Sequence, residues 1–380
     1  MPGSSGACCK LLEPARSCSY SPPMREVAKR SASGGTPAAV VASEAACPGS
    51  RRRGALRCAG ALGVWTVLGG LTACAAPSPP LKVGTVLHPA CELLFLAREM
   101  GLLGVRDIRL VELLSRADNL RLLEEGALHA SVLNLDEFVL CRAARQDLRI
   151  VCVLGVSEGA DAVMARVGLT EPGHLRGKRI AVEDASTGMV LLEALLAAAY
   201  LRADDVVRVP VRPGQGLPQF RAAAVDAVVT TEPFVSQLEA LGAERVFDSA
   251  RLPHRLASVL AVRSHVLDAQ SDAVRQLVAA HFAALEQFER DPGRAWPLMA
   301  PRLRVHHDQL LEQDASAEQL GRGFRGHRLL PVAAQRDLLR AGGGVDLAQR
   351  AVQQDFVARR QLERVVPLQD LLDTRFLPPT

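Results

Sequence analysis

Downstream of residue 80, short apolar runs alternate with longer segments in which apolar residues recur every three or four positions. A short apolar run bounded by glycine or acidic residues is typical of a β-strand, whereas the longer period is typical of an amphipathic helix. Residues 175–201 contain one such pair, in which a strand around Ile180 precedes a helix over residues 189–201. Repeated alternation predicts α/β architecture, with parallel sheets whose loops gather at the carboxyl ends of the strands.

The alternation continues on both sides of this pair and predicts two α/β units, or lobes. In the first lobe we expect strands over residues 81–87, 108–113, 127–133, 148–154 and 160–166, with helices over residues 90–102, 117–125 and 135–144. In the second lobe we expect further strands over residues 206–211 and from Val225 onward.

Beyond residue 257 the pattern becomes helical, apart from a strand expected over residues 258–262. A stripe of apolar residues with a period of 3.6 marks a helix over residues 272–290, and shorter helices are expected over residues 295–299, 317–324, 332–339, 347–362 and 368–372. We expect this helical region to pack on the first lobe. Lobe one then comprises residues 81–170 and 256–380, lobe two comprises residues 171–255, and crossings near residues 165–174 and 253–257 form a hinge.

Composition narrows the functional classes. With 380 residues, of which 48% are hydrophobic, the chain can bury the cores of two domains. Its net charge of +4 is small and the basic residues are scattered, which disfavours nucleic-acid binding. Three cysteines, Cys91, Cys141 and Cys152, follow Cys74 without a C-x-x-C pair, so we interpret them as buried apolar residues. We expect a monomer with no metal and no cofactor.

The first 80 residues predict export. Residues 1–50 are rich in Ser, Gly, Pro and Ala, which indicates disorder or a translation start that in fact lies nearer Met24 or later. Residues 51–53 are three arginines, and residues 58–71 are apolar over the length of a signal peptide. The sequence Leu-Thr-Ala-Cys ending at Cys74 is similar to a lipoprotein signal, so residues 51–73 are the expected signal, Cys74 the lipidated residue and residues 74–80 the tether. A plain transmembrane anchor is the alternative.

The segments LRGKRIAVE, VDAVVTTEPF and GAERVFDS resemble the second lobe of the solute-binding proteins of ABC importers, in the sulfonate/nitrate/taurine and thiamine-precursor group. The resemblance spans roughly residues 81–376. It implies the two-lobed type II periplasmic binding-protein fold, closure of the lobes on a small-molecule solute, and an ABC permease and ATPase as partners. It also implies a binding protein, not an enzyme, and together with the lipoprotein signal it predicts a protein anchored at the periplasmic face of the membrane.

Three strand ends of the first lobe carry candidate ligand residues. His88 stands where the group often has aromatic residues, and it either contacts the solute or caps the following helix. Asn134 and Asp136 follow the next such strand, and one of them either caps a helix or faces the ligand. Ser157 lies in a Gly-bounded turn over residues 155–161, which either binds a ligand or forms a polar hairpin.

Two strand ends of the second lobe carry the others. Ser186 and Thr187 precede a helix whose first N–H groups form a ready anion site. Thr231 and Glu232 end the neighbouring strand, and one or the other is expected to face the cleft. If the acidic residues of the cleft all face inward, an amine-bearing or zwitterionic solute is as suitable as an anion. These acidic residues are Asp136, Glu158, Asp161, Asp184 and Glu232.

Two other classes remain as alternatives. Residues 155–159 fit the G-x-S-x-G pattern of a serine nucleophile, but such an elbow needs a helix directly after it, and a strand is expected there. Effector domains of some transcription regulators share the two-lobed architecture, but residues 1–50 do not supply the helix-turn-helix that they need. A periplasmic enzyme or a ligand sensor on the same fold is therefore the alternative to a transport protein.

The lipid anchor gives a direct prediction. Wild-type protein in cells fed a palmitate analogue should take up the label, and Cys74→Ser should not, because the thiol of Cys74 is the expected acceptor. Label that persists on the variant, or that never appears on wild type, contradicts the anchor.

Overall fold

The computed structural model describes residues 79–113, 115–183, 187–212, 214–311, 321–366 and 371–379, with backbone alone for residues 305–311. The chain divides into units 1–73 and 74–380, and every described residue belongs to the second unit. The expected signal segment, Cys74 and Ser186 lie outside the described residues. Within the described part, no helix is long and apolar enough to cross a membrane.

The first sheet has six strands in the order β11-β4-β10-β3-β1-β2. Strands β1 (Leu81–Val86), β2 (Ile108–Leu113) and β3 (Ala130–Asn134) run parallel to one another. Strand β10 (Ala257–Arg263) is antiparallel to β3 and to β4 (Leu148–Ser157), and β11 (His327–Leu329) is antiparallel to β4 at the edge. The sheet is therefore mixed, because β10 and β11 run antiparallel to the parallel strands that the alternation predicted.

The second sheet has five strands in the order β7-β6-β8-β5-β9. Strand β6 (Arg179–Val182) is parallel to β7 (Val207–Pro210) and β8 (Ala227–Thr231). Strand β5 (Asp161–Ala165) is antiparallel to β8 and to β9 (Glu244–Asp248). The short β9 was not predicted.

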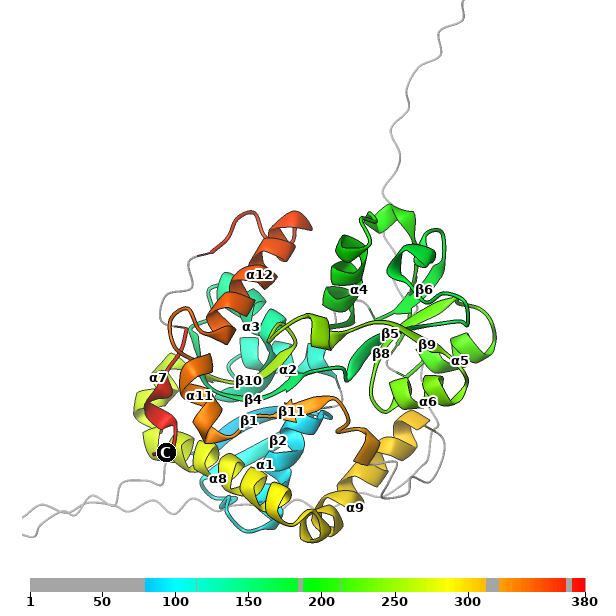
Figure 1. The fold of residues 1–380 in the computed structure, drawn as a ribbon. Helices are drawn as coiled ribbons and strands as arrows, with labels where there is room; N and C mark the ends of the chain where they lie inside the picture. Colours follow the sequence, from blue (N-terminus) through cyan, green and yellow to red (C-terminus); the bar gives the residue numbers. More distant parts are fainter. Residues whose placement is uncertain are drawn as a thin grey trace, which may run out of the picture. The chain divides into compact units, whose positions relative to one another are not determined.

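The period-two pattern of β5 shows how this sheet is covered on both faces. Val163 and Ala165 are buried on the side of α4 (Thr187–Ala198), whereas Ala162 and Met164 are buried on the side of α5 (Gly216–Arg221) and α6 (Phe234–Ala240). Successive side chains of a strand point to opposite faces, so an uninterrupted apolar run needs helices on both. Figure 1 shows these helices around the second sheet.

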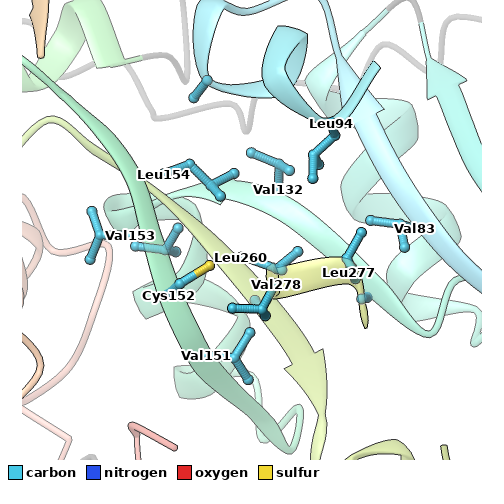
Figure 2. Packing of buried hydrophobic residues seen from close by; sticks show 14 of the residues in the cluster. Val83, Leu94, Val132, Val151, Cys152, Val153, Leu154, Leu260, Leu277 and Val278 are labelled. Atoms are coloured by element: carbon cyan, nitrogen blue, oxygen red, sulfur yellow. The ribbon is translucent and has the colours of Figure 1, made fainter. Parts of the chain in front are cut away.

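Helices from before β4 and from after β10 pack in the first lobe around the first sheet. They are α1 (Pro89–Glu99), α2 (Arg116–Glu124), α3 (Leu135–Ala143), α7 (Ser264–Ala269), α8 (Ser271–Arg290), α9 (Pro292–Leu311), α11 (Val332–Leu338) and α12 (Gly344–Ala358). The stripe predicted on α8 is buried, and its Leu277 and Val278 pack with Leu94 of α1 against the sheet (Figure 2). The prediction of an α/β fold with two lobes and a C-terminal helical region is confirmed.

The first crossing between the lobes differs from the prediction. Strand β5 belongs to the second sheet, so the chain leaves the first sheet at residues 158–160 and not at residues 165–174. The apolar run after Gly159 is long enough for either sheet, and nothing in its pattern indicates which one it joins. The return lies between β9 and β10, at residues 249–256, which overlaps the predicted position.

The C-terminal region holds a second difference. A helix was expected over residues 317–324, of which residues 317–320 lie outside the described residues; residues 321–322 are helical, and a turn over residues 323–326 then leads into β11. Three residues are too few to show a period, so β11 carries no recognisable strand pattern. It adds the edge strand next to β4.

The buried histidine of α8, His281, lacks hydrogen bonds to its ring nitrogens among the described residues. The residue is fully buried. Burial lowers the pKa of His281 to about 3. The folded protein therefore holds a neutral imidazole where the unfolded chain would take up a proton near pH 6.5.

His281→Leu should raise the free energy of unfolding by about 1–3 kcal/mol at pH 7.5, because it removes an unpaired buried polar group of similar size. The gap should widen by up to about 1.4 kcal/mol per pH unit below pH 6.5, because only the unfolded wild type gains a proton there. Urea unfolding at pH 7.5 and 5.0 measures both effects. The exposed His265→Leu is the control, and a gap that stays constant with pH would show that His281 is not held neutral.

Candidate functional site

A pocket of about 120 Å³ lies where the carboxyl ends of strands from the two sheets face each other. From the first lobe, the polar lining residues are His88, Arg116, Asn134, Ser157, Ser258 and His327. From the crossing and the second lobe, they are Asp161, Glu183, Thr187, Thr230 and Thr231. Both lobes therefore contribute hydrogen-bonding groups to one small cavity.

Four helices begin at this pocket. The lining includes His88 just before α1, Arg116 at the first position of α2, Asn134 just before α3 and Thr187 at the first position of α4. The N–H groups of a first helical turn have no partner within the helix and carry partial positive charge. Their convergence favours an anionic or electron-rich group of a ligand.

His88 caps α1 and also lines the pocket. Its Nδ1 accepts a hydrogen bond of 3.2 Å from the backbone N–H of Ala90. A neutral imidazole that accepts at Nδ1 carries its proton on Nε2, which makes it a donor. Burial, together with the nearby His327 and Arg116, lowers the pKa of His88 well below its usual value and keeps the ring neutral.

A hydrogen bond joins the lobes inside the pocket. The Nδ2 of Asn134 donates to the Oγ1 of Thr187, and the backbone N–H of Asn134 donates to Oε2 of Glu137 at 2.7 Å. Asn134 thus ends β3 in the first sheet while its amide reaches the first residue of α4 in the second lobe. The site is assembled by both lobes in this conformation.

Ser157 lines the pocket but has no helix behind it. Its Oγ lies 2.7 Å from Oγ of Ser249 and accepts a 3.1 Å hydrogen bond from the backbone N–H of Asp161. The chain then enters β5, a strand. A nucleophile elbow requires a strand-to-helix turn, so this G-x-S-x-G match lacks its structural context.

Two predicted ligand residues lie outside the pocket lining. Glu232 accepts hydrogen bonds from the backbone N–H and the Oγ of Ser236, at 3.0 and 2.9 Å, and so caps α6. Asp136 is buried in the first turn of α3, where burial and the neighbouring Glu137 raise its pKa to about 6 against the effect of Arg116. Thr231 does line the pocket.

Sequence reasoning missed Arg116, the one arginine among the described lining residues. Its Nη1 donates to Oε2 of Glu137 at 3.2 Å, and 30% of the side chain is exposed. Like His88 and Asn134, it follows a strand of the first sheet, in this case β2, so the same signal would have identified it. His327 was missed because β11 was not predicted.

Carboxyl groups form the other pole of the pocket. Burial raises the pKa of Glu183. The charge of Arg116 lowers this pKa, and the charge of Asp161 raises it further. The pocket therefore offers hydrogen-bond donors to an oxyanion at Arg116, His88 and the helix N-termini. It offers acceptors to an amine or hydroxyl group at Asp161 and Glu183. Among the described residues, no cluster of three or more His, Cys, Asp or Glu side chains has the geometry of a metal site.

Comparison with known proteins matches residues 74–296 to the model of the NMT1-like family. Comparison with curated protein sequences gives no match. The structure is similar to the alkanesulfonate-binding protein SsuA from Xanthomonas axonopodis pv. citri bound to MOPS, with a TM-score of 0.62 and 22% identity over 78% of this chain and 99% of that one.

Two further structures show the breadth of the similarity. The periplasmic aliphatic sulphonate binding protein SsuA from Escherichia coli has a TM-score of 0.64 and 17% identity over 77% of this chain and 97% of that one. The desulfurization enzyme DSZB has a TM-score of 0.56 and 20% identity over 79% of this chain and 98% of that one. The predicted periplasmic binding-protein fold is confirmed, and identities this low show the fold alone.

The described cysteines should be inert. Cys91 is fully buried in α1, burial raises the pKa of its thiol to about 12, and it does not line the pocket. Alkylation with iodoacetamide at pH 8, mapped by peptide mass spectrometry, should label Cys91, Cys141 and Cys152 only after unfolding. Rapid labelling of native Cys91 would indicate an accessible thiolate and favour an enzyme.

Proposed function

The chain belongs to the NMT1-like family, and from this we propose that it is a solute-binding protein that delivers a small solute to an ABC importer. The observation that carries the proposal is the pocket between the lobes, to which each lobe contributes helix N-termini and hydroxyl groups. A solute that touches both lobes favours the closed arrangement, because only differential contact shifts an equilibrium between conformations. The importer's permease and ATPase are its partners, and it acts as a monomer.

The chemistry of the pocket supports a small solute with an oxyanion group. Arg116, the Nε2 of His88 and the hydroxyl of Thr187 are donors within one cavity. A cavity of about 150 Å³ holds a molecule the size of benzene. A pocket of about 120 Å³ suits a solute of that size or smaller. A sulfonate, nitrate, or a small zwitterion whose amine faces Asp161 fits these limits.

The location follows from the N-terminal pattern. The apolar run over residues 58–71 and the Leu-Thr-Ala-Cys sequence ending at Cys74 support export and lipidation, which keep the binding protein beside its permease at the periplasmic face. The similarity to a protein described as periplasmic supports the same compartment.

A hydrolytic or desulfurizing enzyme is the alternative, since DSZB shares the fold. Two observations argue against it: the thiol of Cys91 is buried outside the pocket lining, and Ser157 is followed by a strand and not by the helix that a nucleophile elbow requires. Turnover of ester substrates that Ser157→Ala abolishes would favour the enzyme instead.

Solute binding is tested first by thermal shift with methanesulfonate, taurine, nitrate, sulfate, pyrimidines and small amines, because a ligand specific to the folded state raises the melting temperature. Calorimetry of the compound that binds should then show roughly 5- to 30-fold weaker binding to Thr187→Ala, from the loss of about 1–2 kcal/mol. Arg116→Gln should weaken an anion roughly 10- to 150-fold, because its hydrogen bonds are charge-assisted.

Arg340→Ala is the matched control, since Arg340 is exposed, follows α11 and does not line the pocket. It should bind like wild type, and melting curves should show all variants folded. Equal affinity of wild type, Thr187→Ala and Arg116→Gln would place the solute elsewhere.

A further inference from the structure

The C-terminal segment of residues 321–329, here called the strap, lies beyond the residues that match the family model. It consists of two helical residues (321–322), a turn (323–326) and β11, which pairs with β4 so that His327 lies opposite Ser157 and Leu329 opposite Gly155. His327 and Leu329 both line the pocket. The strap therefore supplies one wall of the site.

The strap rests directly on the first crossing between the lobes. The backbone N–H of Glu158 donates to the carbonyl of Gly326 at 2.7 Å. Gly326 has a φ of +70°, and a Cβ there would lie 2.4 Å from the nitrogen of Ala160. Only glycine allows this backbone approach, so the strap and the crossing are packed as one unit.

Arg325 extends from the strap to the second lobe. Its Nη1 lies 3.1 Å from Oε2 of Glu239 and 3.3 Å from Oγ of Ser236, both on α6. The other oxygen of Glu239 accepts from Arg245 at 2.9 Å, and Arg245 also donates to the carbonyl of Gly159 at 2.6 Å. Glu239 thus connects the strap, the crossing and the second sheet.

His327 projects from the same strap into the pocket. Its ring stands perpendicular to that of His88, with centroids 5.1 Å apart and planes at 82°. The carboxylate of Asp161, the first residue of β5, is close enough to interact electrostatically with His327. The strap therefore lines the pocket through His327 while Arg325 of its turn contacts the opposite lobe.

We propose that the strap is part of the solute site, with His327 contacting the solute's polar group and Arg325 holding the second lobe closed over it. The proposal rests on the proposed solute-binding function. Rotation of the lobes about the crossings must separate Arg325 from Glu239, so this ion pair adds to the closed state. Because affinity scales with the fraction of closed protein, loss of the pair weakens binding without touching the solute.

The chain offers a matched control within the strap. Arg328 alternates with His327 along β11 and pairs with Glu158 at 2.7 Å, and both of these side chains are about 45% exposed. Arg328→Gln thus removes an ion pair of the same strap without breaking a contact to the second lobe. Arg325→Gln removes the pair that joins the lobes, and His327→Ala removes the ring from the pocket.

The first measurement needs no solute. Amide hydrogen exchange by mass spectrometry should be faster in Arg325→Gln than in wild type over residues 232–240 and 157–161, and Arg328→Gln should leave residues 232–240 unchanged. The emission of Trp296, which packs on Phe324 of the strap at 5.4 Å between ring centroids, should also change in Arg325→Gln. Identical exchange in wild type and Arg325→Gln would overturn the link between the lobes.

The second measurement uses methanesulfonate, taurine, nitrate and sulfate as probes in stopped-flow titrations followed by Trp emission. Arg325→Gln should release the bound probe roughly 2- to 5-fold faster, a difference that 0.5 M NaCl should reduce. His327→Ala should bind roughly 3- to 10-fold more weakly, and Arg328→Gln like wild type.

The outcomes distinguish failure of the strap proposal from failure of the proposed solute-binding function. If wild type binds none of the four probes, the anion-binding function fails and the role of His327 falls with it, while hydrogen exchange still decides the role of Arg325. If wild type binds a probe and all three variants behave alike, the function stands and the strap proposal is wrong.

Discussion

The unpaired N–H groups of a helix's first turn are the constraint on which the site depends. A chain that alternates strands and helices places these groups at the carboxyl edges of its sheets, where they need a partner. In this molecule α1, α2, α3 and α4 all begin at one pocket, and a side chain at the N-cap or first position of each helix lines it. The fold thus concentrates partial positive charge at the place where two lobes meet, before any particular side chain is considered.

Side chains then convert this general preference into a specific arrangement. The Nδ1 of His88 caps α1, so the proton of its neutral ring lies on Nε2, which serves as a donor for the pocket. The side chain of Asn134 connects the end of β3 to Thr187 of the opposite lobe. Arg116 supplies a charge that Glu137 holds in place, and Asp161 and Glu183 balance it. The pocket consequently has complementary poles within about 120 Å³, which suits recognition of a small polar molecule better than of an apolar one.

Much of this was predictable from the sequence because it depends on local pattern. The period-two and 3.6-residue signals predicted most strands and the long α8, and strand ends pointed to His88, Asn134, Ser157, Thr187 and Thr231, which line the pocket. Membership of β5 in the second sheet was not predictable, because an apolar run does not specify its neighbours. The three-residue β11 was too short to recognise, so His327 went unseen, and Glu232 was misplaced because its carboxylate caps α6.

The central claim is that one solute is held by both lobes at once. Titration of the ¹⁵N-labelled protein with the solute that gives the largest thermal shift, followed by the amide resonances of Ala90 and Gly188, tests it most directly. These two amides belong to the first turns of α1 and α4 and line the pocket from opposite lobes. The account predicts that both resonances shift with the same Kd. Shifts confined to one of the two amides, or different Kd values for them, would contradict a shared site between the lobes.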